Sequence, residues 1–271
     1  MPVITLTTDF GRRDPWVGAV KGVILSINPE ATIVDVSHGV SPQKIIEGAF
    51  ILSRACSYYP EGTIHVAVVD PGVGTERRPV LIETERYFFI GPDNGLFTRV
   101  VSSEKVKQVI ELDNSDYFLT QVSATFHARD VFAPVAAHLS RGVKPSELGT
   151  VMEEPLMLDL PKPEVSSATI KGEVLYIDSF GNLISNIAEA DISTMLERGE
   201  IDIDIRWRTI HGLVESYIEG GLGRNVGNAV ALIGSSGFLE IAAYKDNAAA
   251  ALGVSVGEKV DIRLRPIIPE K

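Results

Sequence analysis

The chain has 271 residues, of which 45% are hydrophobic and 23% charged, a composition typical of globular proteins. A chain of this length can bury one large core or two modest ones. Its formal net charge is -11, with 36 acidic against 25 basic residues, and no stretch rich in Lys or Arg supplies a local basic surface. Phosphate backbones and acidic membranes require such a surface, so we expect neither a nucleic-acid partner nor a membrane partner.

The one cysteine, Cys56, cannot form a disulfide within the chain, which is typical of a reducing compartment. No stretch approaches the ~20 apolar residues that span a bilayer. The first residues run into a strand-like pattern, without the basic start and apolar segment of a signal peptide. We therefore expect a cytoplasmic protein.

Apolar runs and helical patterns alternate in the first half of the chain. The predicted strands cover residues 3–8, 32–36, 64–69, 80–84, 87–90 and 106–112. The predicted helices cover residues 15–28, 45–58 and 131–139, with a further short helix from Leu96. Strands that alternate with helices predict an α/β domain with a mainly parallel sheet and helices on its faces.

Three prolines, Pro155, Pro161 and Pro163, interrupt this alternation, and we place a linker at residues 156–167. The α/β domain then covers residues 1–155, and a second domain covers residues 168–271. Strand patterns recur in the second domain at residues 168–178, 183–186, 201–207, 229–233, 239–244 and 259–264. Short strands separated by turns rich in Gly and Asn predict a small antiparallel barrel or sandwich.

Acidic and polar residues gather where the predicted strands end. Asp9 follows the first strand, and Asp35 and His38 lie at the end of the second. Asp70 follows the third strand. In open α/β sheets, ligands bind outside the carboxyl ends of the strands, so these loops share one rim. Each aspartate alone would most simply be a turn residue, but several on one rim favour a binding site.

A further candidate, His127, lies at the expected start of a helix beside Arg129 and Asp130. The other histidines are not spaced like metal ligands on a helix, so the sequence gives only weak support to a metal site. The chain also lacks the glycine-rich phosphate loop and the Gly-x-Gly-x-x-Gly dinucleotide motif. Ordinary kinase, dehydrogenase and methyltransferase functions are therefore disfavoured.

Seven short motifs follow one another along residues 3–265. They are Thr8-Asp9-Phe10-Gly11, Ile33-Val-Asp35-Val-Ser-His38, Asp70-Pro-Gly-Val-Gly-Thr-Glu-Arg77-Arg78, Gly91-Pro-Asp-Asn-Gly-Leu96, Thr125-Phe-His127-Ala-Arg-Asp130, Asp178-Ser-Phe-Gly-Asn182 and Ile233-Gly-Ser-Ser-Gly-Phe-Leu-Glu240-Ile-Ala. In this order they resemble the S-adenosyl-methionine (SAM) hydroxide adenosyltransferases. That family is related to fluorinating and chlorinating enzymes, which attack the same carbon with halide.

The resemblance implies an enzyme that hydrolyses SAM to adenosine and methionine, with no cofactor and no metal. It implies an N-terminal α/β domain joined to a C-terminal antiparallel β-barrel, in a homotrimer whose sites lie between neighbouring subunits. The catalytic trio of the family falls on Asp70, Arg77 and His127, and Asp9 matches the carboxylate that holds the ribose hydroxyls. The other substrate-binding positions fall on Phe126, Asp178, Phe180, Asn182, Tyr217, Ser235, Ser236 and Glu240.

These residue types suit attack by water on the ribose C5′. The sulfonium is already a good leaving group, whereas water is a weak nucleophile that is hardly ionised at neutral pH. A site can hold one water in line with the C5′–S bond, and Arg77 can stabilise the charge that develops on its oxygen. Asp70 would orient Arg77 and accept a hydrogen bond from the water. We favour His127 as the proton acceptor, because a neighbouring arginine makes the Asp70 carboxylate a weaker base.

The same trio argues against halide transfer, because the Asp70 carboxylate would repel an incoming anion. Two other functions remain open. One is a metal-dependent phosphohydrolase with Asp9, Asp35, Asp70 and His127 as metal ligands. The other is a non-catalytic protein that binds SAM or another nucleoside without turning it over.

Overall fold

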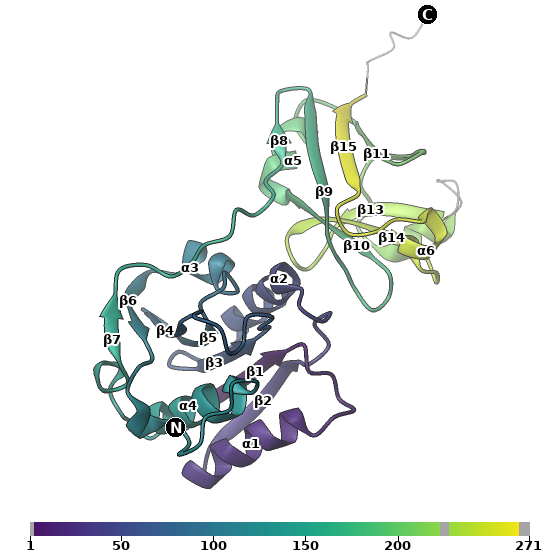
Figure 1. Cartoon of the computed structure of the whole chain (residues 1–271). Coiled ribbons are helices and arrows are strands. Elements are labelled where there is room, and N and C mark those ends of the chain that lie inside the picture. Colours follow the sequence, from purple (N-terminus) through teal and green to yellow (C-terminus); the bar gives the residue numbers. More distant parts are fainter. Residues whose placement is uncertain (1–2, 223–227, 266–271) are drawn as a thin grey trace, which may run out of the picture. The chain divides into compact units, whose positions relative to one another are not determined.

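A computed structural model of the protein describes residues 3–222 and 228–265. The chain forms two compact units, Met1–Asp159 and Leu160–Lys271, each with its own sheet and its own hydrophobic core (Figure 1). Among the described residues, none of the helices has the length and the apolar character needed to span a bilayer.

The first unit is built on a seven-stranded sheet with the strand order β2-β1-β3-β5-β4-β6-β7. Its strands are β1 (Val3–Thr8), β2 (Thr32–Ser37), β3 (Ile64–Val68), β4 (Pro79–Thr84), β5 (Phe88–Pro92), β6 (Val106–Glu111) and β7 (Thr150–Met152). Strands β1, β2, β3 and β5 pair in parallel, whereas β4 and β7 run against their neighbours. Most strands therefore point the same way, and the predicted mainly parallel sheet is confirmed.

Helices cover both faces of this sheet (Figure 1). They are α1 (Trp16–Ile27), α2 (Ile45–Ala55), α3 (Thr98–Ser103) and α4 (Ala133–Ser140), with the short turns η1 (Cys56–Tyr58), η2 (Ser115–Tyr117), η3 (Ala128–Phe132) and η4 (Pro145–Glu147). Along β3 and just beyond it, Ile64, Val66 and Val68 join the core under α1 and α4, while Ala67 and Val69 join the core under α2 and α3. Burial on both faces explains why this strand is apolar almost throughout.

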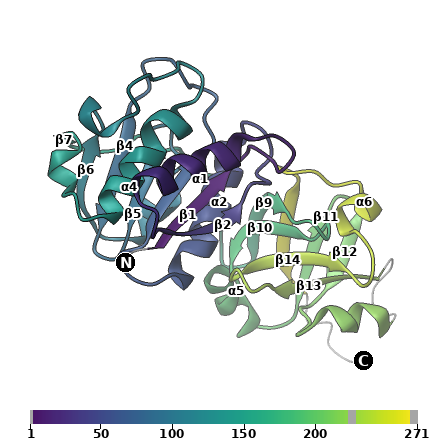
Figure 2. The same cartoon turned by 90° about the horizontal axis from the view of Figure 1, so that it is seen from below.

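The second unit is an antiparallel, nearly closed barrel (Figure 2). Its elements are β8 (Glu164–Val165), β9 (Thr169–Ile177), β10 (Leu183–Ala188), α5 (Glu189–Leu196), β11 (Ile201–Ile205), β12 (Arg208–His211), η5 (Tyr217–Leu222), β13 (Ala229–Ile233), β14 (Phe238–Ala243), α6 (Ala248–Leu252) and β15 (Lys259–Leu264). The strand order is β12-β11-β15-β9-β10-β14-β13, with β8 paired to β9. Beyond β12, the Val214 N–H donates to the Ala231 carbonyl of β13 at 2.9 Å, so the two ends of the sheet meet. The predicted barrel is confirmed.

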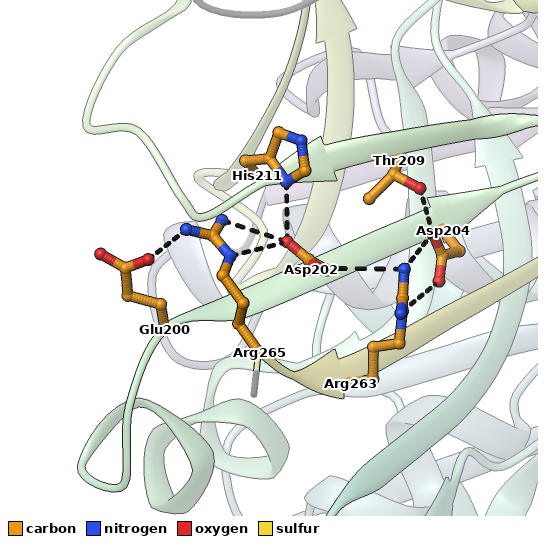
Figure 3. A network of polar contacts seen from close by, with 7 residues as sticks. All are labelled: Glu200, Asp202, Asp204, Thr209, His211, Arg263 and Arg265. Carbon is orange, nitrogen blue, oxygen red and sulfur yellow. Dashed lines mark hydrogen bonds and ion pairs between the residues drawn. The ribbon is translucent and has the colours of Figure 1, made fainter. Parts of the chain in front are cut away.

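A network of ion pairs lies on the face of β11 that points away from the core (Figure 3). Asp202 accepts from His211 of β12 at 2.8 Å and from Arg265, just after β15, at 3.1 Å. Asp204 of the same strand pairs with Arg263 of β15 at 2.7 Å. Burial alone would raise the pKa of Asp202, but the hydrogen bonds from His211 and Arg265 lower it. The network therefore ties the edge strand β12, through β11, to β15.

Five short elements, β7, β8, β12, α5 and α6, lie outside the predicted elements. Each spans two to eight residues, and such short elements carry a weak hydrophobic pattern. The helix predicted at residues 131–139 also begins earlier than expected, as the π-helical turn η3 followed by α4. The turn is π-helical because the Ala133 N–H donates to the Ala128 carbonyl, five residues earlier in the chain.

Candidate active site

A cavity of about 300 Å³ lies at the carboxyl ends of β1 and β3. Asp9 directly follows β1 and Asp70 lies two residues beyond β3, and both line the cavity. Phe126 and His127, which precede η3, line it as well. The fold thus brings these four predicted residues together at the edge of the sheet where open α/β folds bind their ligands.

Close packing at Gly74 holds the loop after β3 against the segment before His127. Gly74 has a φ of 79°, and a Cβ atom there would lie 2.2 Å from the Ala124 carbonyl oxygen. A residue with a side chain fits neither this backbone conformation nor this contact. Glycine at position 74 therefore lets the loop that carries Asp70 and Arg77 pack directly on the segment that carries His127.

Arg77 holds Asp70 through a two-pronged ion pair. Arg77 Nε lies 3.0 Å from both carboxylate oxygens, and Nη2 lies 2.5 Å from Oδ2. The exposed fractions of the two side chains are only 8% for Arg77 and 6% for Asp70. A buried ion pair offsets its lost hydration only when its geometry is good, and the bidentate contact supplies that geometry. Asp70 is therefore fixed in one orientation at the cavity wall.

The same Nη2 nitrogen of Arg77 lies 2.8 Å from His127 Nδ1. A guanidinium can only donate, so Nδ1 accepts and the ring proton of neutral His127 sits on Nε2. Burial lowers the pKa of His127, and the charge of Arg77 lowers it further, which favours this neutral form. With Nδ1 occupied and Nε2 protonated, the ring has no free lone pair. The geometry therefore argues against our expectation that His127 takes the proton from water.

Arg77 lies behind Asp70 and His127 and does not line the cavity. Its guanidinium carbon is 5.4 Å from the centroid of the Phe132 ring. Its Nη1 atom is buried and has no hydrogen-bond partner in the described part of the chain. The expected contact between Arg77 and the attacking oxygen therefore gains no support from the cavity. Arg77 contacts the two residues that do face it.

Gln43 lines the same cavity and was not among the predicted site residues. Its backbone N–H donates to Asp9 Oδ2 at 2.9 Å, which fixes that carboxylate. Its φ of 66° lies in the left-handed region, which costs a residue with a side chain about 1–2 kcal/mol. Backbone strain of this kind gathers at functional sites, but a glutamine side chain gives no sequence signal for it.

Phe126 belongs to an aromatic cluster at the cavity. Its ring makes edge contacts with Phe10 and Trp16, with centroid distances of 5.9 Å and 5.4 Å. The Arg129 guanidinium lies 5.0 Å from the same ring, and its Nε pairs with the fully buried Asp130 at 2.6 Å. Trp16 is 47% exposed, so the cluster reaches from the cavity to the surface. Arg129 and Asp130 thus support the segment that carries Phe126 and His127.

The second unit holds a cavity of its own, with a volume of about 670 Å³. Most of the residues predicted to bind substrate in this unit line it, namely Asp178, Phe180, Asn182, Tyr217, Ser235 and Glu240. Ser236 does not line it. Lys245, which no sequence motif indicated, lines it as well and has a left-handed φ of 55°.

A tight turn after β9 presents Asp178 to this cavity. Asp178 Oδ1 accepts from the N–H groups of Phe180 and Asn182 at 2.9 Å, and Oδ2 accepts from the Asn182 side chain at 3.0 Å. Gly181 completes the turn with a φ of 85°, and a Cβ atom there would lie 2.1 Å from Asn247. The turn leaves Phe180 75% exposed at the edge of the cavity.

A second carboxyl group, Glu240, lines the same cavity and is only 6% exposed. It accepts a hydrogen bond from the Tyr217 hydroxyl at 2.7 Å. Burial raises the pKa of Glu240 and the charge of Asp178 raises it further, against the effect of Tyr217. Burial and the bond to Glu240 raise the pKa of Tyr217 to about 12. The cavity is lined by three carboxyl groups, with Asp246 as the third, against one lysine, and this excess favours a ligand that carries positive charge.

The described residues contain no group of three or more His, Cys, Asp or Glu side chains placed to hold a metal ion. Of the four residues considered as phosphohydrolase ligands, Asp35 pairs with Lys21 at 2.6 Å and with His38 at 3.0 Å. Asp35 is not among the residues that line the first cavity. The four residues do not converge, and the arrangement does not favour that function.

Two family profiles match the chain in succession. The SAM hydroxide adenosyltransferase N-terminal domain matches residues 4–149, and the C-terminal domain of the same family matches residues 172–261. The chain belongs to this family. The resemblance carried by the seven motifs is thereby confirmed.

Relatives that are named (R)-S-adenosyl-L-methionine hydrolase share much of the sequence. The one from Methanocaldococcus jannaschii is 38% identical over 97% of this chain and 96% of its own length, and the one from Thermus thermophilus is 36% identical over 96% and 99%. A fluorinase from Actinoplanes sp. is 29% identical over 94% of this chain and 97% of its own length. The crystal structure of an uncharacterized conserved protein from Thermotoga maritima matches 97% of this chain and 100% of that chain, with a TM-score of 0.89 and 32% identity.

Proposed function

We propose that the protein hydrolyses SAM to adenosine and L-methionine by direct attack of water on the ribose C5′. The observation that carries this proposal is the Asp70 carboxylate, which lines the cavity and is fixed by Arg77. A fixed carboxylate can hold a water in line with the C5′–S bond, and it repels a halide ion. Family membership and the names of the hydrolase relatives support the same reaction.

The lengths of the alignments also favour hydrolysis over halide transfer. The hydrolase from M. jannaschii aligns over 268 positions, close to the 271 residues of this chain. The fluorinase aligns over 296 positions, more than this chain contains, so it carries residues that this chain lacks.

In the proposed step, the water oxygen forms a bond to C5′ while the C5′–S bond breaks. The electrons of that bond go to sulfur, and the sulfonium becomes the neutral thioether of methionine. The proton of the water passes to Asp70 and then to solvent, because His127 has no free lone pair while Arg77 donates to it. His127 offers only its Nε2–H, which can donate to the water oxygen and orient it.

Arg77 acts through its two neighbours in this proposal. Its bidentate contact sets the orientation of the Asp70 carboxylate, and its Nη2 group sets the tautomer of His127. Neither task requires contact with substrate, which agrees with the absence of Arg77 from the cavity lining. We therefore propose that Arg77 positions Asp70 and His127, the two residues that contact the attacking water.

The proposed substrate contacts are divided between the two units. Asp9 binds the ribose hydroxyls and Phe126 packs beside the nucleoside in the first cavity. In the second cavity, Asp178 and Glu240 supply negative charge that matches the sulfonium and ammonium groups of SAM. The remaining proposed contacts with the nucleoside and the methionine are Phe180, Asn182, Tyr217, Ser235 and Ser236.

We further propose that the protein is a homotrimer in the cytoplasm. Each site would combine the domain 1–155 of one subunit with the domain 168–271 of its neighbour, and residues 156–167 would link the two domains of one chain. The division of the binding residues between two cavities supports this arrangement. A cavity of about 300 Å³ also lies at the lower limit for enclosing a ligand of the size of SAM. The single buried cysteine fits a reducing compartment.

The test is to incubate the purified protein with each sulfonium diastereomer of SAM separately and to analyse the products by chromatography. The hydrolase relatives are named for the (R) form, and we propose the same preference here. We expect adenosine and methionine in equal amounts, with full activity in the presence of a chelator. S-adenosyl-homocysteine as the product, an absolute metal requirement, or binding without turnover would refute the proposal.

A further inference from the structure

A chain of hydrogen bonds lies beneath the Asp9 loop, where β1 and β2 end side by side (Figure 2). The pairing register of the two strands shifts between Leu6 and Thr7, at a bulge. A bulge re-aims the side chains that follow it. His38, directly after β2, turns back toward β1, and its Nδ1 lies 2.8 Å from the Thr8 hydroxyl. The side chain that immediately precedes Asp9 is thus held by the neighbouring strand.

The contacts of His38 continue to Asp35 and Lys21 at the surface. His38 Nε2 lies 3.0 Å from Asp35 Oδ1, and the other oxygen of Asp35 pairs with Lys21 at 2.6 Å. Burial would raise the pKa of Asp35, but its contacts with Lys21 and His38 lower it, so the carboxylate is charged. The nearby carboxylate favours a proton on His38 Nε2, and in that tautomer Nδ1 accepts from the Thr8 hydroxyl.

The chain of hydrogen bonds ends on the backbone just beyond Asp9. Thr8 Oγ1 accepts from the Phe10 N–H at 3.2 Å, and the His38 carbonyl accepts from the Gly11 N–H at 2.8 Å. The side chains of His38 and Thr8 are both buried. The Asp9 carboxylate is fixed separately, by the backbone N–H of Gln43. Its backbone and its side chain are thus held from two directions, and it faces the cavity in one orientation.

We infer that Thr8 and His38 are positioning residues that hold the turn at residues 8–11 so that Asp9 can bind the ribose hydroxyls of the substrate. The inference rests on the proposed function, in which Asp9 is the ribose ligand. Neither residue lines the cavity, so both act through Asp9. Ribose contacts exist before and during the reaction, so losing this support weakens ligand binding more than it slows the chemical step.

Strand β1 itself supplies a matched control. Thr5 is also buried, and its hydroxyl lies 2.7 Å from Nδ1 of another buried histidine, His65. Thr5 is in the middle of the strand, away from the turn that carries Asp9. Thr8→Val and Thr5→Val thus remove the same chemical group from the same strand, but only the first disturbs the turn.

The experiment compares Thr8→Val, Thr5→Val and Thr8→Ser by the Kd for adenosine, by KM and kcat for SAM, and by Tm. We expect Thr8→Val to weaken adenosine binding about tenfold, the effect of one lost hydrogen bond, and to raise KM more than it lowers kcat. Thr5→Val should lower Tm while Kd stays within about twofold. Thr8→Ser keeps the hydroxyl and should restore binding. Equal Kd values for Thr8→Val and Thr5→Val would overturn the inference.

A second variant, Asp35→Ala, removes the exposed residue at the other end of the same chain of contacts. The Asp35 side chain is 36% exposed, so Asp35→Ala should fold even if Thr8→Val does not. About threefold weaker adenosine binding is expected, and unchanged binding would overturn the inference. If the unmodified protein neither binds adenosine nor turns over SAM, the proposed function fails and the inference fails with it. An active protein with an unaffected Thr8→Val variant refutes the inference alone.

Discussion

Arg77 donates a hydrogen bond from Nη2 to Nδ1 of His127 across 2.8 Å. This one bond places the His127 proton on Nε2 and removes the imidazole as an acceptor. Of the two side chains that contact Arg77, only Asp70, held at 2.5 Å, can then accept a hydrogen bond from an attacking water. Arg77 contributes both a positive charge and a bidentate geometry to this arrangement, and substitutions can separate the two contributions.

Arg77→Lys keeps the positive charge but loses the bidentate grip. We expect kcat to fall at least about 100-fold, because lysine presents one nitrogen and cannot hold Asp70 and His127 together. The Kd for SAM should stay within about threefold, because Arg77 does not line the cavity. Single-turnover kinetics and calorimetry measure the two effects. The control is Arg78→Lys, which alters the neighbouring arginine that pairs with Asp93. Near-normal turnover in Arg77→Lys would show that charge alone is sufficient.

Asp9→Ala should act on binding. Its proposed partners are the ribose hydroxyls, which are present in substrate, transition state and adenosine alike, so the Kd for adenosine should rise about tenfold or more. Asp14→Ala removes an exposed carboxylate from the same loop and should leave Kd unchanged. Calorimetry with adenosine distinguishes the two variants. Normal adenosine binding in Asp9→Ala would remove Asp9 from the ribose site.

His65 should make stability depend on pH. Burial lowers the pKa of His65 from 6.5 to about 4. Between these values the unfolded chain binds a proton that the folded chain does not, so stability is lost as the pH falls from 6.5 toward 4. A shift of this size corresponds to about 3 kcal/mol over the whole window. Urea unfolding at several pH values should show a shallower slope for His65→Gln. Identical slopes in the two proteins would contradict the assignment.

Complementation tests the proposed homotrimer. Asp9→Ala and Asp178→Ala each remove a proposed ligand from a different domain, so each variant alone should have low activity at SAM concentrations below the KM of the unmodified protein. If each site combines domains from two subunits, dissociation and reassembly of a mixture should restore some intact sites. A mixture of each variant with itself is the control. A fully active monomer by light scattering, or a mixture that regains no activity, would rule out shared sites.

The sequence predicts most of the fold because the sheet of the first unit is buried on both faces. The strand predicted from the apolar run of β3 and the helices predicted from the periodic patterns of α1 and α2 are present in the structure. Strand β12 was not predicted, because it is a four-residue edge strand held by the polar network of Figure 3. Helix α6 spans five residues and depends on an Asn247 side chain that accepts from the Ala250 N–H at 2.7 Å. Such local contacts leave no periodic hydrophobic pattern in the sequence from which the element could be predicted.

The candidate site could be predicted less completely than the fold. Motifs at strand ends located Asp9 and Asp70, because the carboxyl ends of parallel strands share one edge, and a motif at a helix start located His127. The sequence does not distinguish an arginine in a cavity from one behind it, and the position of Arg77 depends on packing around it. The left-handed backbone of Gln43 likewise follows from tertiary contacts that no residue type encodes.

The origin of the adenosine 5′-oxygen tests direct attack by water most directly. One turnover is run in ¹⁸O-water with enzyme in excess over SAM, and the products are analysed by mass spectrometry. If a water held by Asp70 attacks C5′, the label appears in the 5′-hydroxyl of adenosine and is absent from methionine. If Asp70 instead attacked C5′ and water then opened the ester at its carbonyl, the adenosine of the first turnover would carry an unlabelled carboxylate oxygen. Unlabelled adenosine would therefore contradict the mechanism proposed here.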